Sequence, residues 1–220
     1  MPTRRISRTS RAARGARGPR MTEVAGVILA GGQATRMGGG DKGLHHIAGR
    51  TMLDHVIDRF APQVGALALN ANGDGARFRG YGLPVLPDSV AGYAGPLAGV
   101  LAGLDWAAAE GHAQVATVAV DTPFFPTDLV ARLSAAAGGG LALAATEEDG
   151  KLWRHPTFGL WPVSLRDDLR AALAEGLRKI VMWTDRHDAA TVIFDSRSGD
   201  PFFNVNTPED LALAQAMVRE

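Results

Sequence analysis

The chain has 220 residues, of which 46% are apolar, and its 23 basic and 23 acidic residues balance, so composition allows one sizeable hydrophobic core. It contains no cysteine, which excludes disulfides, thiolate metal sites and thiol nucleophiles. It also contains no run of 18 apolar residues, so we expect a cytoplasmic protein with no membrane partner.

The first 20 residues differ from the rest, because they hold seven arginines and no acidic residue. The remaining residues carry 16 basic against 23 acidic side chains, which argues against a nucleic-acid partner for the body of the protein. The segment lacks the apolar stretch of a secretory or twin-arginine signal. We expect residues 1–20 to be a disordered extension and residues 21–220 to form a single domain; a transit peptide or a nucleic-acid-binding arm is the alternative for the extension.

From Val24 onward, strand-like and helix-like segments alternate, which is typical of a mostly parallel sheet with helices on both faces. Continuous apolar runs predict buried strands at 24–30, 64–70, 115–121 and 141–146. Three helices are predicted, each from its own signal. Apolar residues at helical spacing predict a helix at 52–60, a proline at the first helical position predicts one at 96–110, and a closing run of three glycines marks the end of one at 126–137.

The C-terminal third is less regular. Residues 153–161 are expected to form an irregular strand that returns to the sheet, two helices are expected within 164–188, and 191–195 is a candidate last strand. Thr207 as N-cap and Pro208 at the first helical position predict a final helix. These capping rules leave Asn204 and Asn206 unexplained.

The segment VILAGGQATRMGGGDKGL, residues 27–44, runs from the first strand into a glycine-rich loop. Glycines allow backbone N–H groups to approach a ligand closely, and a loop between a strand and a helix directs those donors at an anion. The segment therefore favours phosphate binding. It is not a P-loop, because Lys42 lies between Asp41 and Gly43 rather than after a glycine and before Ser or Thr.

Gly38, Gly40 and Gly43 satisfy the spacing G-x-G-x-x-G, but they do not lie in the turn that follows the first strand. The next predicted strand ends in Asn70 and not in the acidic residue that would bind a ribose. We interpret the match as accidental. An NAD(P)-dependent oxidoreductase is retained as an alternative of another class.

Six segments carry further information when taken in order along the chain: LAGG…TRMGGGDKGL, NAN, PDSVAGYAGPLAG, DTPF, HPTF and NVNTPEDL. Together they resemble the corresponding segments of the molybdenum cofactor guanylyltransferases, the MobA family, and the resemblance covers about residues 24–214. It implies a three-layer, Rossmann-like fold of the glycosyltransferase-A type. It also implies transfer of GMP from GTP to the terminal phosphate of molybdopterin, with or without molybdenum. A cytidylyltransferase acting on the same pterin, other nucleotidyltransferases with this loop, and a non-catalytic GTP sensor are the remaining alternatives.

The resemblance also implies site residues. Those expected to bind GTP are Leu29, Ala30, Gly31, Gly32, Lys42, Asn70, Asp88, Gly95 and Asp121. Arg36 and Lys42 are expected to stabilise charge on the α-phosphate and the departing pyrophosphate. Asp121 ends a strand that needs no acid for packing, and Mg²⁺ takes one or two carboxylates together with phosphate oxygens, so Asp121 is the expected Mg²⁺ ligand.

The remaining implied contacts lie elsewhere in the site. Asp88 is expected to contact guanosine, because a carboxylate can accept two N–H donors. His155, Asn204 and Asn206 are expected near the pterin, whereas Asn72 is interpreted as a turn former only. Expected protein partners are transient: other proteins of cofactor biosynthesis and acceptor molybdoenzymes. The protein itself is expected to be a monomer.

Overall fold

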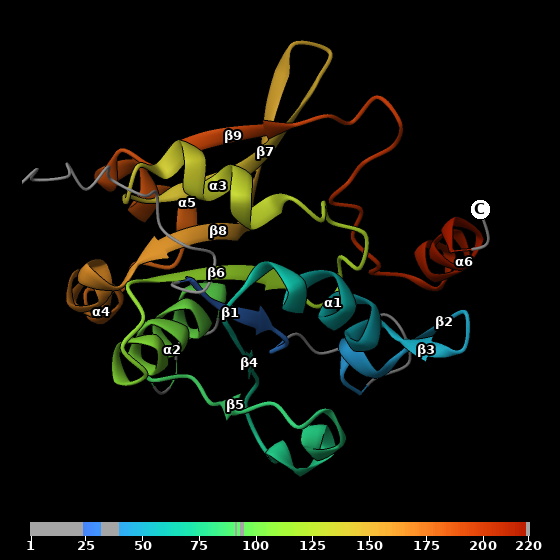
Figure 1. Cartoon of the computed structure of the whole chain (residues 1–220), viewed down its shortest axis with the longest axis horizontal. Helices are drawn as coiled ribbons and strands as arrows, with labels where there is room; N and C mark the ends of the chain where they lie inside the picture. Colours follow the sequence, from blue (N-terminus) through green and yellow to red (C-terminus); the bar gives the residue numbers. More distant parts are fainter. Residues whose placement is uncertain (1–23, 32–39, 91, 93–94, 219–220) are drawn as a thin grey trace, which may run out of the picture.

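A seven-stranded sheet in the order β5-β4-β1-β6-β8-β7-β9 forms the centre of the computed structural model (Figure 1), which describes residues 24–31, 40–90, 92 and 95–218. Its strands are β1 (Val24–Leu29), β4 (Ala66–Asn70), β5 (Val85–Leu86), β6 (Gln114–Ala119), β7 (Ala142–Glu148), β8 (Lys151–Pro162) and β9 (Ala190–Phe194). Strand β8 is antiparallel to both neighbours and the other adjacent strands are parallel, which confirms the mostly parallel sheet.

Helices cover both faces of this sheet, so the three-layer expectation is confirmed. One face packs against α1 (Met52–Phe60) and α3 (Leu129–Ala137). The other packs against α2 (Pro96–Ala109), α4 (Arg166–Ala174) and α5 (Ile180–Thr184). Every residue of β1 is buried, as continuous apolar strands between two helical layers are.

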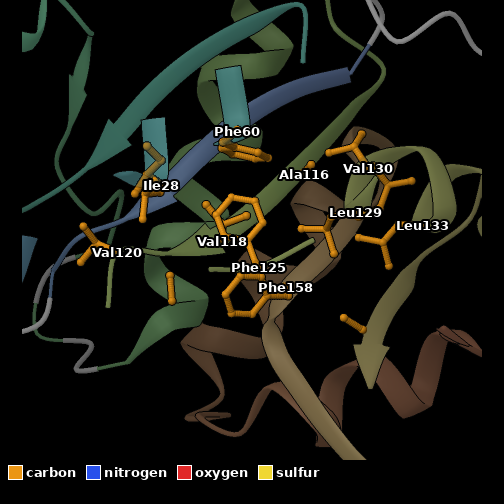
Figure 2. Close-up of a cluster of buried hydrophobic side chains, with 14 of the residues drawn as sticks. Ile28, Phe60, Ala116, Val118, Val120, Phe125, Leu129, Val130, Leu133 and Phe158 are labelled. Atoms are coloured by element: carbon orange, nitrogen blue, oxygen red, sulfur yellow. The ribbon is translucent and has the colours of Figure 1, made fainter. Parts of the chain in front are cut away.

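The face covered by α1 and α3 holds a dense aromatic cluster. Figure 2 shows the rings of Phe60, Phe125 and Phe158 beside Ile28 and Val118 of the sheet. The rings of Phe60 and Phe125 meet edge to face with centroids 6.0 Å apart. This cluster fixes α1 and the segment after β6 against the sheet.

Local chemistry explains where the helices begin and end. Thr51 and Asp54 form a capping box at the start of α1, and Pro96 occupies the first position of α2. Gly138 ends α3 with φ of 55°, a conformation that favours glycine. The irregular strand expected at 153–161 is β8, whose pairing with β7 shifts register between Leu143 and Ala144.

Several short elements were not expected from the sequence. They are the strand β5, the hairpin β2 (His46–Ile47) and β3 (Arg50–Thr51), and the 3-10 segments η2 (Lys42–Leu44) and η4 (Gly75–Tyr81). The final helix, α6 (Pro208–Met217), lies beside the β2–β3 hairpin (Figure 1) and buries Ala214 in a small cluster with Ile47. Among the described residues, none of the helices is long and apolar enough to cross a membrane.

The carboxyl ends of three parallel strands lie level at one edge of the sheet. Leu29 of β1 is in register with Asn70 of β4 and with Ala119 of β6. The chain leaves β1 for β4 on one side and later returns to β6 on the other, which makes this edge the topological switch point, where open α/β sheets bind ligands.

Candidate functional site

A cavity of about 600 Å³ lies at this switch point. Its volume is within the range of small-molecule sites. The lining residues are Leu29, Gly31, Lys42, Asn70, Asn72, Asp88, Gly95, Pro96, Ala119, Val120, Asp121, Thr157 and Asn204. Many of the residues predicted from the sequence are therefore brought together, although Leu29 and Asn204 are 175 residues apart in the chain.

One group of these residues gathers around the side chain of Lys42. Its Nζ lies 3.0 Å from Oδ2 of Asp121 and also donates to Oδ1 of Asn206. The side chains of Lys42 and Asp121 are only 16% and 22% exposed, so water screens this ion pair less than a surface pair. Gly43 makes the arrangement possible, since a Cβ there would lie 2.7 Å from Cγ2 of Val120.

The segment around Asn204 is held against the end of β6. The backbone N–H of Val205 donates to the carbonyl of Asp121 at 2.8 Å, and the hydroxyl of Thr122 donates to Oδ1 of Asn204 at 2.8 Å. These bonds place Asn204 in the cavity lining next to Asp121.

The cap of α6 places the neighbouring Asn206. Oδ2 of Asp210 accepts from the backbone N–H groups of Asn206 and Thr207, both at 2.9 Å. These donors, Asn206 first, keep the pKa of the Asp210 carboxyl below its usual value. One carboxylate thus caps the helix and orients a residue that contacts Lys42.

A second group of polar residues holds the carboxylate of Asp88. The buried Asn70 donates from Nδ2 to Oδ1 of Asp88 at 3.0 Å and to the carbonyl of Leu86 at 3.1 Å. Asn72 donates from Nδ2 to Oδ2 of Asp88 at 2.8 Å, and its own Oδ1 accepts from the backbone N–H of Asp88 at 2.9 Å. Each carboxylate oxygen keeps lone pairs for a further N–H donor.

The interpretation of Asn72 as a turn former only is wrong. Its side chain lines the cavity and makes two hydrogen bonds with Asp88. Thr157 and Pro96 also line the cavity and were not singled out from the sequence. All three lie inside the segments NAN, HPTF and PLAG that carried the resemblance, so position within a recognised motif was the available signal.

Some predicted residues take other positions. Ala30 is buried and its backbone N–H pairs with the carbonyl of Asn70 at 2.9 Å, so it does not line the cavity. His155 is also outside the lining; its Nε2 lies 2.9 Å from the hydroxyl of Thr146 and its ring stacks on Phe202 at 4.2 Å. Gly32, Arg36 and the arginine-rich residues 1–20 lie outside the described residues.

Across the part of the chain that the structure describes, no group of three or more His, Cys, Asp or Glu side chains could hold a metal ion. The described lining of the cavity instead offers single oxygen donors, foremost the carboxylate of Asp121, and one cationic side chain, Lys42. This donor set suits a ligand that brings its own anionic oxygens, since a hard cation can be shared between one carboxylate and phosphates.

Comparison with known proteins gives matches to nucleotide-transferring enzymes, which use ligands of the kind that this cavity suits. A sequence model described as the MobA-like NTP transferase domain matches residues 26–190. A molybdenum cofactor guanylyltransferase from Bradyrhizobium sp. is 56% identical over 202 residues, which cover 89% of this chain and 93% of that protein. A protein of the same name from Mesorhizobium japonicum is 49% identical over 205 residues, with 90% and 97% covered.

Solved structures agree on the fold. Molybdopterin-guanine dinucleotide biosynthesis protein A from Archaeoglobus fulgidus superposes with a TM-score of 0.69 at 22% identity, covering 89% of this chain and 98% of that one. The 2-C-methyl-D-erythritol 4-phosphate cytidylyltransferase from Thermus thermophilus gives a TM-score of 0.67 at 21% identity, with 88% and 98% covered. The names of these two proteins refer to different substrates or products. At 21–22% identity, the similarity therefore shows a shared fold only.

Proposed function

The chain belongs to the MobA-like NTP transferase family, and from this premise we propose that it transfers GMP from GTP to the terminal phosphate of molybdopterin, with or without bound molybdenum. An oxygen of the pterin phosphate attacks the α-phosphorus of GTP, the bond from that phosphorus to the bridging oxygen of the β-phosphate breaks, and pyrophosphate leaves. The product is the guanine dinucleotide form of the cofactor.

The observation that carries this proposal is the distribution of charge in the cavity. A carboxylate with spare acceptor capacity, Asp88, is held in one group of lining residues, and the pair of Lys42 and Asp121 is held in another. Guanine presents two adjacent N–H donors, which a carboxylate can accept, and a triphosphate presents anionic oxygens, which an ammonium can bind. GTP carries both features in one molecule.

The residues would contribute to catalysis mainly by position and charge. Lys42, and with it Arg36 from the glycine loop, would bind triphosphate oxygens and stabilise the negative charge that grows on the α-phosphate and on pyrophosphate. Leu29, Gly31, Gly32 and Gly95 would supply backbone and apolar surface to the nucleotide. Asn204, Asn206 and His155 are proposed for the pterin end.

Mg²⁺ is the proposed cofactor, and the oxygen donors of the cavity fit it. Asp121 would hold it together with phosphate oxygens and water, and bound Mg²⁺ would neutralise charge on the phosphates. The existing ion pair with Lys42 is compatible, because a carboxylate has two oxygens and the bond to Lys42 uses only Oδ2. We further propose that the protein acts in the cytoplasm as a monomer, with transient contacts to other proteins of cofactor biosynthesis and to acceptor molybdoenzymes.

Thermal unfolding with GTP, CTP, ATP and NADPH, each with and without Mg²⁺, tests the nucleotide assignment. A nucleotide at a hundred times its Kd stabilises the folded state by about 2.7 kcal/mol, which shifts the unfolding midpoint measurably. We expect a shift with GTP that Mg²⁺ enlarges, followed by formation of pyrophosphate when molybdopterin is added. A shift with CTP alone would indicate the cytidylyl reaction, binding of GTP without turnover would indicate a sensor, and a shift with NADPH alone would contradict nucleotide transfer.

A further inference from the structure

Arg77, on η4, lies between the two groups of cavity residues without lining the cavity itself. Its Nε lies 2.6 Å from Oδ2 of Asp41 and its Nη2 lies 3.3 Å from Oδ1 of the same residue, a two-pronged ion pair. Nη2 also donates to the carbonyl of Asn72 at 2.8 Å, and Nη1 donates to the carbonyl of Asp74. One guanidinium therefore joins the segment before Lys42 to the turn that follows β4.

Two of these anchor points, Asp41 and Asn72, adjoin or belong to the cavity. Asp41 immediately precedes Lys42, whose ammonium contacts Asp121. The side chain of Asn72 donates one hydrogen bond to the carboxylate of Asp88 and accepts another from the backbone N–H of the same residue. Arg77 thus links the segment that carries the Lys42 ammonium to a residue that bonds Asp88.

The contact is better suited to fixing geometry than to adding stability. The side chains of Arg77 and Asp41 are 27% and 25% exposed, and partly exposed ion pairs contribute little to the free energy of unfolding. The planar fork of arginine, however, fixes direction as well as distance, which a lysine ammonium cannot do. Its two further bonds to backbone carbonyls hold the fork in one orientation.

We propose that Arg77 is a positioning residue that sets the spacing between the Lys42 and Asp88 ends of the nucleotide site. This inference rests on the proposed use of GTP. Without Arg77 the two ends move independently, and binding GTP must then order both. The KM for GTP rises, whereas kcat changes less, because Arg77 makes no contact that exists only in the transition state.

Steady-state kinetics and calorimetric GTP binding on the full chain test this, with variants Arg77→Ala, Arg77→Lys and Asp41→Asn. Arg77→Ala is expected to raise the KM and the Kd for GTP by about tenfold. Arg77→Lys restores charge but not the fork, so it should recover only part of that affinity. Arg79→Ala is the matched control, since Arg79 is an exposed arginine on the same 3-10 segment and should leave the KM unchanged.

A double-mutant cycle separates positioning from general loosening. If Arg77 acts through Asp41, the combined variant should raise the KM less than the product of the two single effects. Wild-type KM in either Asp41→Asn or Arg77→Ala, with or without a lower Tm, would overturn the inference and leave the proposed function intact. A wild-type protein that neither binds nor turns over GTP would overturn the proposed function instead.

Discussion

Lys42 is the residue that most directly connects the observed geometry to the proposed reaction. It is the cation among the residues that line the described cavity, and it already contacts a carboxylate and an amide oxygen that belong to two other segments. An ammonium in this position can exchange one of those partners for a phosphate oxygen when a nucleotide enters.

Replacing Lys42 by alanine should therefore reduce turnover of GTP. Loss of one charge-assisted hydrogen bond costs about 1.5–3 kcal/mol, so kcat/KM should fall by about ten- to a hundredfold. The variant also leaves Asp121 without its ammonium partner, which Lys42→Arg would partly restore. Pyrophosphate release from both variants is the measurement, and wild-type kcat/KM in Lys42→Ala would rule out a role in phosphate binding.

His155 supplies a pH dependence of stability. Burial lowers the pKa of its imidazole below the ordinary value of 6.5, and the carboxylate of Asp200 opposes this only in part. The unfolded chain then binds a proton more readily than the folded protein does, so the free energy of unfolding falls as the pH drops below about 6.5.

Urea unfolding at pH 7.5 and 5.5 checks this sign. The loss of stability on acidification should be smaller in His155→Gln than in the wild type, because glutamine does not titrate. His46→Gln is the control, since His46 is an exposed histidine and its replacement should leave the loss unchanged. Equal losses in His155→Gln and the wild type would contradict the assignment.

At the scale of elements, α2 matters because it packs directly on the side chain that holds Asp88. A Cβ built on Gly99 would lie 2.2 Å from Oδ1 of Asn70 and 2.9 Å from Cδ2 of Leu29. Only a glycine lets the helix approach β4 this closely while Asn70 keeps its bonds. The position of the helix and the orientation of Asn70 are therefore set together.

Gly99→Ala should displace Asn70 and raise the KM for GTP by about tenfold or more, since small displacements in a site have large effects. Gly103→Ala is the matched control one helical turn away. Its Cβ would lie 2.9 Å from Cγ2 of Val27, an apolar core contact, so it should lower the Tm without raising the KM. Equal KM values in the two variants would contradict the prediction, because they would show that Asn70 accommodates the added methyl group without loss of GTP affinity.

The longer elements could be predicted because their signals are local. The capping box at Thr207 and the proline at the start of α2 depend on residues a few positions apart. The strand β5 could not be predicted, since two residues, Val85–Leu86, carry no periodicity and pair only because β4 lies beside them. Helix α3 begins at Leu129, three residues after the expected Pro126, because residues 127–128 form a turn before it; the N-cap, Asp128, makes no side-chain capping bond.

At the scale of the molecule, Thr117 joins the strands at which the sheet changes from parallel to antiparallel. Its hydroxyl, on β6, donates to the carbonyl of Thr157 at 2.8 Å and accepts from Nε1 of the buried Trp161 at 2.8 Å, both on β8. The ring of Trp161 in turn stacks on Trp183 with centroids 6.1 Å apart. These contacts tie the N-terminal half of the sheet, with strands β1, β4 and β6, to the C-terminal half.

Thr117→Val should lower the free energy of unfolding by about 1–3 kcal/mol, because the indole N–H would stay buried without an acceptor. Guanidinium unfolding measures the change, and the transition should stay cooperative. Trp161→Phe is the informative comparison, because it removes the indole N–H and leaves the bond between Thr117 and Thr157. In this background, Thr117→Val should lower the free energy of unfolding by less than it does in the wild type.

The candidate site could be predicted from the sequence in part, through motifs and through the positions of strand ends. Residues at strand ends, such as Asn70 and Asp121, follow from the rule that open sheets bind ligands at their carboxyl edge. Arg77 could not be found in this way, because its partner Asp41 is 36 residues distant and no local pattern marks the pair. Ala30 was assigned to the site by motif, yet its backbone N–H donates to the carbonyl of Asn70 in β4.

The cap of α6 couples the position of Asn206 to the helix–coil equilibrium of the first turn of this helix. Asp210 holds the backbone of Asn206, and Asn206 holds the ammonium of Lys42, so fraying of the first turn of this helix of ten residues releases one partner of the lysine. Terminal helices open locally at low free-energy cost. The fraction of molecules in which α6 is wound at its start therefore sets how often the amide oxygen of Asn206 is held beside the ammonium of Lys42.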